Sequence, residues 1–396
     1  MSTLNSENDT RLTSYDQLID YFLTAEKPEE SWKIGVEHEK FIVDKDTKKP
    51  FAYEGHQSIL AIFEKLQAKA WEPIYDKTHI IGLKKDKTII SLEPGGQLEL
   101  SGAPHSNLED VTHEINQHLK DLHQILPSLN GQILWTGVHP TAKRDDMAQV
   151  PKSRYVLMKK YMPMVGSMGL DMMLRTSSIQ VNLDFSSEAD MVQKFRIATA
   201  LTPFVVALFA NSRALEGKDT GFESYRTHIW QNTDNDRSGL LPFVFDDTIG
   251  YKAYIDYALN VPMYFIMRDN QYVDALGVKF IDFWENKAEK LKQYQASMGD
   301  WVNHLTTLFP EIRLKSYLEV RMMDAGTPEM ISKAAYFWSS VLYDHDIRNE
   351  IYDLIMSWPK EQIYKAYQEV PKLGFETPFL GGTLMDLKKS ILDRIY

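Results

Sequence analysis

The chain has no cysteine among its 396 residues. It therefore has no disulfide bond, no thiolate metal ligand and no cysteine nucleophile. Long hydrophobic segments are missing as well. The longest apolar run, residues 197–210, contains Pro203 and falls short of the roughly 20 residues that span a bilayer. We expect this run to form a buried helix, and we expect no membrane partner.

The two commonest nucleotide-binding loops are also missing. The sequence has neither a Walker A motif nor a GxGxxG motif after a strand, so it predicts neither a P-loop nor a Rossmann site. A net charge of −11 argues against a nucleic-acid partner, because phosphate backbones require clustered Lys and Arg. Residues 1–11 are polar and acidic, unlike a secretory signal. Together with the missing cysteines, they predict a cytoplasmic protein.

What the sequence does contain is a pair of glutamates within a strand pattern. Residues 34–41 (IGVEHEKF) predict a β-strand whose side chains alternate between two faces, so that Glu37 and Glu39 share one face. Because like charges repel, this pair requires a counter-charge such as a divalent metal or an arginine. A solvated strand face explains the octapeptide equally well, and recurrence of the pattern decides between the two.

The same pattern recurs in residues 89–102, 178–185 and 317–322, each of which alternates apolar side chains with acidic, amide or basic ones. Their polar side chains are Glu93, Gln97 and Glu99 in the first segment, Gln180, Asn182 and Asp184 in the second, and Glu319 and Arg321 in the third. The Pro94, Gly95 and Gly96 sequence interrupts the first of these segments as a bulge or tight turn that allows close approach of the backbone.

Helices are predicted between and after these strands from apolar residues at helical spacing and from capping residues. We expect them at residues 14–23, 58–70, 106–126, 154–161, 187–211, 251–259 and 303–308. We interpret His113, His118 and His123 of the third helix as surface residues. From Thr327 onward only helical patterns occur, which predicts a catalytic domain at residues 1–325 and a C-terminal helical segment packed on it at residues 326–396. The fold class is α+β.

In one sheet, the four strands would form a basin with helices packed on the opposite, apolar face. The basin would hold five carboxylates, those of Glu37, Glu39, Glu93, Glu99 and Glu319. Five carboxylates stay ionised in a concave site only with cations beside them. Oxygen ligands without thiolates select Mg²⁺ or Mn²⁺ over zinc, and magnesium held in this way leaves positions open for phosphates. The basin therefore predicts phosphoryl transfer from a nucleotide.

Two arginines lie in the irregular segment 217–241. Arg226 and Arg237 could bind carboxylates or phosphates through two parallel hydrogen bonds. Pairing with Asp234 or Asp236, or capping of a helix, explains them equally well at this point.

Taken together, five segments resemble the signatures of plant and proteobacterial glutamate–cysteine ligases, which belong to the glutamine synthetase-like carboxylate-amine ligases. They are residues 34–41 (IGVEHEKF), 91–104 (SLEPGGQLELSGAP), 180–185 (QVNLDF), 233–237 (TDNDR) and 318–321 (LEVR). The resemblance runs in the same order from residue 34 to beyond residue 338.

This resemblance implies ATP-dependent joining of the γ-carboxylate of L-glutamate to the amine of L-cysteine through γ-glutamyl phosphate, the first step of glutathione biosynthesis. It implies a glutamine synthetase-like curved antiparallel sheet, Mg²⁺ or Mn²⁺ as cofactor and ATP as co-substrate. The partners would be these small molecules, and we expect a monomer or weak homodimer.

The resemblance also implies roles for individual residues. The five glutamates would hold the metal ions, Arg321 would contact the transferred phosphate, and Arg226 and Arg237 would bind substrate carboxylate or phosphate. Arg321 and Arg237 are the predicted catalytic residues. The other predicted substrate-binding residues are Gln180, Asn182 and Tyr264, with Tyr264 bordering the cysteine pocket.

Two alternatives stay open. The first is the same ligase chemistry with another amine acceptor, because scattered side chains set acceptor pockets. The second is a noncatalytic homologue that binds a nucleotide or an amino acid. Five mutually repelling glutamates argue against this second alternative.

Overall fold

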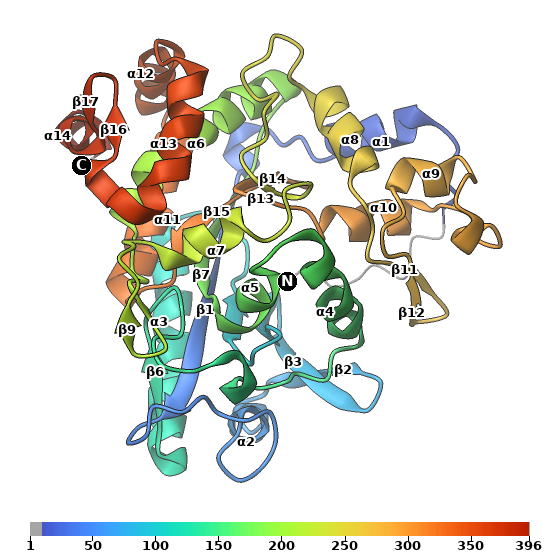
Figure 1. Ribbon diagram of the computed structural model, residues 1–396, viewed down its shortest axis with the longest axis vertical. Helices are drawn as coiled ribbons and strands as arrows, with labels where there is room; N and C mark the ends of the chain where they lie inside the picture. Colours follow the sequence, from blue (N-terminus) through green and yellow to red (C-terminus); the bar gives the residue numbers. More distant parts are fainter. Residues whose placement is uncertain (1–9, 396) are drawn as a thin grey trace.

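The centre of the molecule is a nine-stranded sheet (Figure 1). The structure, a computed structural model, describes residues 10–395. The strands follow the order β14-β15-β7-β1-β5-β4-β3-β2, and β6 pairs with the far half of β1. Their bounds are β1 (Ile34–Asp44), β2 (Glu72–Asp76), β3 (His79–Lys85), β4 (Thr88–Leu92), β5 (Leu98–Ser101), β6 (Gly131–Leu134), β7 (Ser178–Leu183), β14 (Ile312–Leu314) and β15 (Leu318–Asp324). Every pair in this sheet is antiparallel, which confirms the expected fold class.

The register of the strands brings the predicted polar residues together. Glu37 on β1 lies opposite Gln180 on β7, and Glu39 lies opposite Glu99 on β5. Glu319 on β15 lies opposite Asn182 on β7. Directly paired residues present their side chains on the same face of a sheet. These pairings therefore place side chains from four separate strands on one face.

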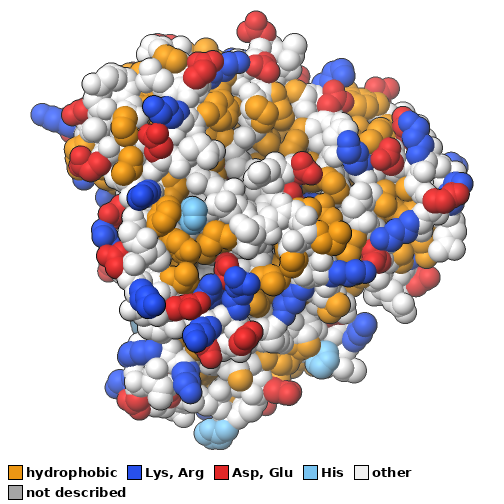
Figure 2. Space-filling model, viewed as in Figure 1, with side chains coloured by type: hydrophobic (Ala, Val, Ile, Leu, Met, Phe, Trp, Pro, Cys, Tyr) orange, Lys and Arg blue, Asp and Glu red, His pale blue; other side chains and the backbone are white. Residues whose placement is uncertain are grey.

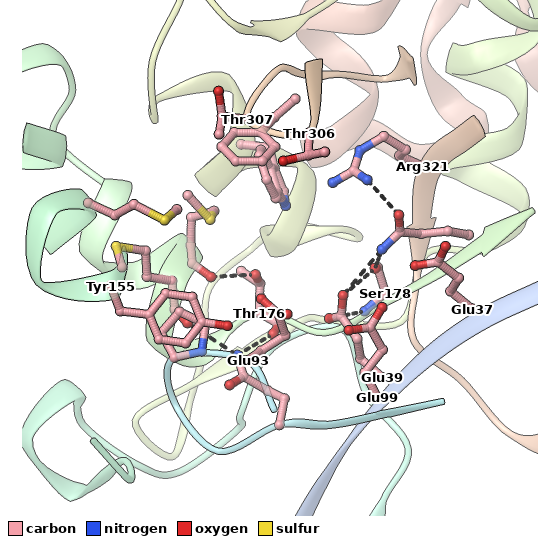
Figure 3. A pocket seen from close by; sticks show the side chains of 18 of the residues that line it. Glu37, Glu39, Glu93, Glu99, Tyr155, Thr176, Ser178, Thr306, Thr307 and Arg321 are labelled. Carbon is pink, nitrogen blue, oxygen red and sulfur yellow. Dashed lines mark hydrogen bonds between the residues drawn. The ribbon is translucent and has the colours of Figure 1, made fainter. Parts of the chain in front are cut away.

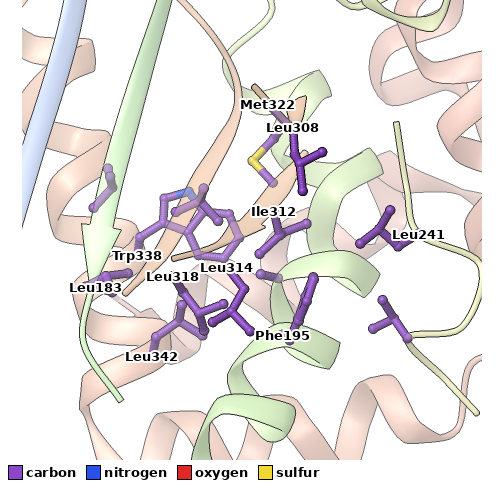
Figure 4. Close-up of a cluster of buried hydrophobic side chains, with 14 of the residues drawn as sticks. Leu183, Phe195, Leu241, Leu308, Ile312, Leu314, Leu318, Met322, Trp338 and Leu342 are labelled. Atoms are coloured by element: carbon purple, nitrogen blue, oxygen red, sulfur yellow. The ribbon is translucent and has the colours of Figure 1, made fainter. Parts of the chain in front are cut away.

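Helices cover the apolar face of the sheet. Helices α3 (Leu108–Ile125) and α11 (Pro328–Tyr343) contact β1, while α6 (Glu188–Leu208) contacts β15. Leu183, Phe195, Leu318 and Trp338 are among the buried side chains that fill the space between them (Figure 4). Helix α6 is the helix expected from the longest apolar run. It is long and apolar enough to cross a membrane, but 78% of its most apolar part is buried inside the protein, as in a core helix.

Shorter elements surround this central layer. The helices are α1 (Tyr15–Leu23), α2 (Ile59–Gln67), α4 (Ser153–Val165), α5 (Gly169–Arg175), α7 (Tyr225–Gln231), α8 (Tyr251–Asn260), α9 (Phe280–Trp284) and α10 (Met298–Leu305). The short strands are β8 (Ala214–Leu215), β9 (Lys218–Asp219), β10 (Ser238–Gly239), β11 (Phe265–Arg268), β12 (Gln271–Asp274) and β13 (Phe309–Pro310). Side-chain caps begin several helices: the Ser58 Oγ accepts from the Ala61 N–H, and the Ser187 Oγ accepts from the Asp190 N–H.

The C-terminal part of the chain is mainly helical and lies at the upper left of Figure 1. It contains α11, α12 (His345–Met356), α13 (Lys360–Leu373) and α14 (Leu384–Ile395), with a hairpin of β16 (Pro378–Phe379) and β17 (Gly382–Thr383) that the sequence did not predict. Helix α13 contacts both α6 and α7. The division of the chain at residue 325 stays a prediction.

The predicted surface position of His118 is wrong. Its side chain is buried between α3 and β1, where its Nε2 lies 3.1 Å from the Nζ of the buried Lys40. The reason is its position three residues after Ile115 and four before Leu122, on the buried stripe of the helix.

Candidate active site

A cavity lies on the polar face of the sheet, bordered by residues of α4, α5, α7 and the segment 306–313 (Figure 3). Of the residues predicted from the sequence, those that line it are Glu37, Glu39, Glu93, Glu99, Gln180, Arg226 and Arg321. Those that do not line it are Glu319, Asn182, Arg237 and Tyr264. On the face of the molecule shown in Figure 2, acidic and basic side chains are interspersed rather than gathered by sign.

Hydrogen bonds hold the glutamates of the cavity in place. Glu39 accepts from the backbone N–H of Ser178 at 2.9 Å and from the Ser178 Oγ at 3.0 Å. Glu99 accepts from the Ser91 Oγ at 2.7 Å, and Glu37 accepts from the Asn182 Nδ2 at 2.9 Å. Asn182 therefore contributes to the site by orienting Glu37.

Two of these glutamates, Glu37 and Glu39, are short of positive charge. Burial, together with the nearby carboxylates of Glu93 and Glu99, raises the pKa of Glu39 to about 8. Burial also raises the pKa of Glu37, and Glu99 and Glu319 add to that rise. A cation that binds beside such a carboxyl group stabilises its ionised form.

This donor set fits a hard cation held partly by substrate. Within residues 10–395, no three His, Asp or Glu side chains are placed so that they could hold a metal ion by themselves. Magnesium, however, is usually bound through one or two carboxylates together with substrate phosphates and water. Glu39, Glu93 and Glu99 supply carboxylate oxygens at the cavity, and their mutual repulsion is the electrostatic condition that a divalent cation relieves.

Glu319 has a different set of contacts. Its carboxylate pairs with Arg313 at 2.5 Å, with Lys315 at 2.9 Å and with Arg321 at 2.8 Å. These three cations, Arg313 most of all, hold the pKa of Glu319 well below its usual value. Burial of Glu319 opposes this shift. Glu319 thus fixes two of the arginines that line the cavity.

Two of the predicted arginines line the cavity from different elements. Arg321 on β15 donates from Nη1 to the Gln180 Oε1 at 2.5 Å, which also explains the position of Gln180. Arg226 on α7 donates to the backbone oxygens of Met322 and Arg321, at 3.2 and 3.0 Å. The sequence left two structural explanations open for Arg226, a helix cap and a pair with Asp234 or Asp236. The contacts with the backbone of β15 fit neither.

Arg237 and Tyr264 lie beside the cavity rather than on it. Arg237 is fully buried, pairs with Asp234 at 2.6 Å and donates to the Thr307 oxygen at 3.1 Å. Its guanidinium carbon lies 4.0 Å from the centre of the Tyr264 ring. Arg237 thus holds the segment that carries Thr307, which does line the cavity, and Tyr264 packs on Arg237. The pairing with Asp234, one of the explanations left open, is the arrangement found.

Several residues that line the cavity were not predicted from the sequence as site residues, among them Gln97, Arg154, Trp230 and Arg313. Only Gln97 lay in a recognised strand pattern. Arg154 opens a helix without an acidic neighbour that would explain it, and Arg313 lies in a three-residue strand too short to show a pattern. Each of the four has a buried polar atom without a hydrogen-bond partner within residues 10–395.

The sequence is similar to those of known proteins. The model of glutamate-cysteine ligase family 2 matches residues 33–380. Glutamate–cysteine ligase A, chloroplastic, of Oryza sativa subsp. japonica is 45% identical over 378 residues, which cover 95% of this chain and 76% of the relative. Glutamate–cysteine ligase, chloroplastic, of Arabidopsis thaliana is 46% identical over 378 residues, 95% of this chain and 72% of the relative.

The fold is also similar to that of a solved structure. A glutamate–cysteine ligase from Francisella tularensis, determined in complex with AMP, superposes with a TM-score of 0.51 at 15% identity. The superposition covers 92% of this chain and 77% of the other. At this level of identity the likeness supports the expected glutamine synthetase-like fold.

The predicted cytoplasmic location is wrong. The relatives from rice, Brassica juncea and Arabidopsis thaliana are all named as chloroplastic. The prediction rested on missing cysteines and on a polar first segment. A composition without cysteine is compatible with any redox environment and does not specify a compartment.

Proposed function

Because this chain belongs to glutamate–cysteine ligase family 2, we propose that it joins the γ-carboxylate of L-glutamate to the amine of L-cysteine at the expense of ATP. The product is γ-glutamylcysteine, and the reaction is the first step of glutathione biosynthesis. The observation that carries the proposal is the cavity itself, in which glutamates of β1 and β5 and of the turn before β5 share one space with Arg226, Arg313 and Arg321.

The reaction proceeds in two steps. An oxygen of the glutamate γ-carboxylate attacks the γ-phosphorus of ATP, the bond to the β-phosphate oxygen breaks, and ADP leaves. The amine nitrogen of cysteine then attacks the acyl carbon, the bond from that carbon to the phosphate oxygen breaks, and the amine proton leaves with phosphate. No covalent intermediate on the protein is required.

Arginines neutralise the charge that moves during the first step. Arg321 contacts the transferred phosphoryl group, and Arg226 binds the substrate carboxylate or phosphate. A planar guanidinium donates two parallel hydrogen bonds to such groups. Because Glu319 and Gln180 hold Arg321 in place, its charge is oriented before substrate binds.

Glu319 is better suited to orienting Arg321 than to binding a metal ion. Its two oxygens already accept from Lys315 and Arg321 and pair with Arg313, so we assign it a positioning role. Arg237 and Tyr264 are likewise assigned to support of the Thr307 segment.

We infer that Mg²⁺, or Mn²⁺ in its place, is held by Glu39, Glu93 and Glu99, with Glu37 beside them. When bound, such an ion neutralises charge on the phosphates and orients them for in-line transfer. The residues of the chain then determine where the glutamate substrate lies, and the apolar wall of the cavity excludes water from the acyl phosphate.

The test is product formation by the purified protein. With MgATP, L-glutamate and L-cysteine, we expect ADP, phosphate and γ-glutamylcysteine in equal amounts, measured by coupled assay and mass spectrometry. ADP release that does not depend on glutamate would contradict the proposal. A full turnover rate with a non-thiol amine in place of cysteine would instead support the alternative acceptor.

A further inference from the structure

A buried lysine lies directly behind the glutamates of the cavity. Glu39 and Lys40 are neighbours on β1, so their side chains point to opposite faces of the sheet. Glu39 lines the cavity, whereas Lys40 is fully buried on the face that the helices cover. An amine in such a place requires hydrogen-bond partners. The phosphoryl-transfer chemistry proposed above uses neither Lys40 nor the side chains around it.

Three possible partners surround the Lys40 Nζ. The backbone oxygens of His38 and Leu98 accept from it at 3.2 and 3.3 Å. The Nε2 of His118, on α3, lies 3.1 Å away. Because His38 belongs to β1 and Leu98 to β5, one side chain connects two neighbouring strands and contacts the helix that covers them.

The two backbone bonds form in either protonation state of Lys40. An ammonium has three N–H donors, which serve the two carbonyl oxygens and an unprotonated His118 Nε2. A neutral amine has two, which still serve both oxygens, while its lone pair accepts from the other tautomer of His118. Burial lowers the pKa of Lys40 to about 7, and the attraction of Glu99 and Glu39 opposes this shift. Both states therefore occur near neutral pH without breaking the contact between the strands.

Each of the two carbonyl groups belongs to the peptide unit that precedes a cavity glutamate. The carbonyl carbon of His38 is bonded to the nitrogen of Glu39, and that of Leu98 to the nitrogen of Glu99. Because the atoms of a peptide unit lie in one plane, a bond that fixes the oxygen also fixes the Cα of the next residue. Glu39 and Glu99 lie opposite each other on β1 and β5, and Figure 3 shows their side chains close together. Lys40 thus connects the backbones of two glutamates whose carboxylates repel each other.

We propose that Lys40 is a positioning residue that, from the opposite face of the sheet, sets the separation of the Glu39 and Glu99 carboxylates for a divalent cation. This inference rests on the ligase function and the metal site proposed above. Metal ligands must be held within about 0.5 Å of their productive positions. Replacing a residue that orients such ligands lowers metal affinity by about 10- to 100-fold.

The contribution of Mg²⁺ to nucleotide binding tests the proposal without turnover. The Kd for a nonhydrolysable ATP analogue is measured by calorimetry, once with Mg²⁺ and once with EDTA. The ratio of the two Kd values reports the coupling between metal and nucleotide. In Lys40→Met, which keeps an apolar side chain but loses both N–H bonds, we expect this ratio to fall by about tenfold or more. The KM for Mg²⁺ in ADP release should rise, and the KM for glutamate at saturating Mg²⁺ should not.

Two control variants separate positioning from packing. Lys194 is also fully buried, but its Nζ donates to the Asp184 oxygen outside the cavity. His118→Leu removes the contact with α3 and keeps both carbonyl bonds of Lys40. Lys194→Met and His118→Leu should each keep the ratio within about threefold of the unmodified protein. An equal fall in His118→Leu would assign the effect to the packing of α3 and overturn the proposal.

A chemical rescue decides the question if Lys40→Met does not fold. Because the chain has no cysteine, Lys40→Cys carries a single thiol. In urea its thiolate displaces bromide from 2-bromoethylamine, which gives a lysine analogue with sulfur in place of Cγ. After refolding, we expect the alkylated protein to show a ratio within about threefold of the unmodified protein refolded in parallel. A low ratio in the alkylated protein, or an equal ratio without alkylation, would overturn the proposal.

The unmodified protein separates failure of this inference from failure of the proposed function. If Mg²⁺ does not tighten binding of the analogue to it, the metal site is wrong. If it releases no ADP in response to glutamate, the ligase function is wrong. An unchanged ratio in Lys40→Met, with both properties present in the unmodified protein, would overturn the positioning role alone.

Discussion

The Nη1 of Arg321 donates to the Gln180 Oε1 at 2.5 Å and to the Glu319 Oε2 at 2.8 Å. One guanidinium nitrogen thus joins β15 to the neighbouring β7 at the edge of the cavity. Because both partners are buried, this arginine is held in a single orientation, which is the property that charge stabilisation in a reaction requires.

Arg321→Lys should lower kcat by about two orders of magnitude, because lysine keeps the charge but loses the paired donors that orient it. The measurement is glutamate-dependent ADP release. Arg213→Lys is the control, since Arg213 is an exposed arginine paired with Glu223 and lies outside the cavity. Equal activity of the two variants would remove Arg321 from the mechanism.

Glu319→Gln should destabilise the protein by about 3–5 kcal/mol in urea unfolding, because three buried cations lose their shared counter-charge. The cations are Arg313, Lys315 and Arg321. The exposed Glu64 on α2 provides the control, and Glu64→Gln should change stability by less than about 0.5 kcal/mol. A similarly small effect at Glu319 would mean that the cations find other partners.

In the presence of a nonhydrolysable ATP analogue, adding Mg²⁺ should raise the unfolding temperature of the protein, and EDTA should reverse the rise. At a hundredfold excess over Kd, binding contributes about 2.7 kcal/mol. Glu39→Gln should abolish most of this response, because an amide replaces a carboxylate ligand. Glu64→Gln should leave it intact. An undiminished response in Glu39→Gln would exclude Glu39 from the metal site.

Lys194 makes a pH-dependent contribution to the free energy of unfolding. Its ammonium lies 3.3 Å from the centre of the Trp32 ring, and burial lowers its pKa to about 8 even though Asp190 opposes this shift. Between pH 8 and 10.5 the unfolded chain therefore holds a proton that the folded protein has released, so stability rises with pH through that window. The rise is at most about 3 kcal/mol.

Lys194→Met should lack this contribution, so urea unfolding at pH 8 and pH 10 should show a smaller gain for the variant than for the unmodified protein. Other titrating groups are the same in both proteins and cancel in the comparison. Parallel pH profiles would show that Lys194 titrates alike in the folded and unfolded states.

The strands of the site could be predicted because each carries a two-residue alternation. Residues 34–41, 178–185 and 317–322 overlap β1, β7 and β15, and the acids fall on the face where alternation places them. Strands β2 and β3 were not predicted, because Pro73 and a run of lysines hide any alternation. The strand order could not be predicted either, since β7 reaches its place beside β1, and β15 its place beside β7, across long connections.

The site was only partly predictable for a related reason. Glu37 and Glu39 belong to a periodic element, so their shared face follows from the sequence. Arg154, Trp230 and Arg313 reach the cavity from elements whose placement depends on tertiary packing. Arg237 shows the converse: its motif is recognisable, but its side chain is taken up by Asp234 and backbone oxygens.

The central claim is that the cavity transfers the γ-phosphoryl group of ATP to the side-chain carboxylate of glutamate. The most direct measurement uses glutamate labelled with ¹⁸O in its γ-carboxylate, followed by mass analysis of the phosphate released with ADP. The account predicts that one labelled oxygen appears in each phosphate for every γ-glutamylcysteine formed. Unlabelled phosphate in a reaction that still yields γ-glutamylcysteine would contradict it.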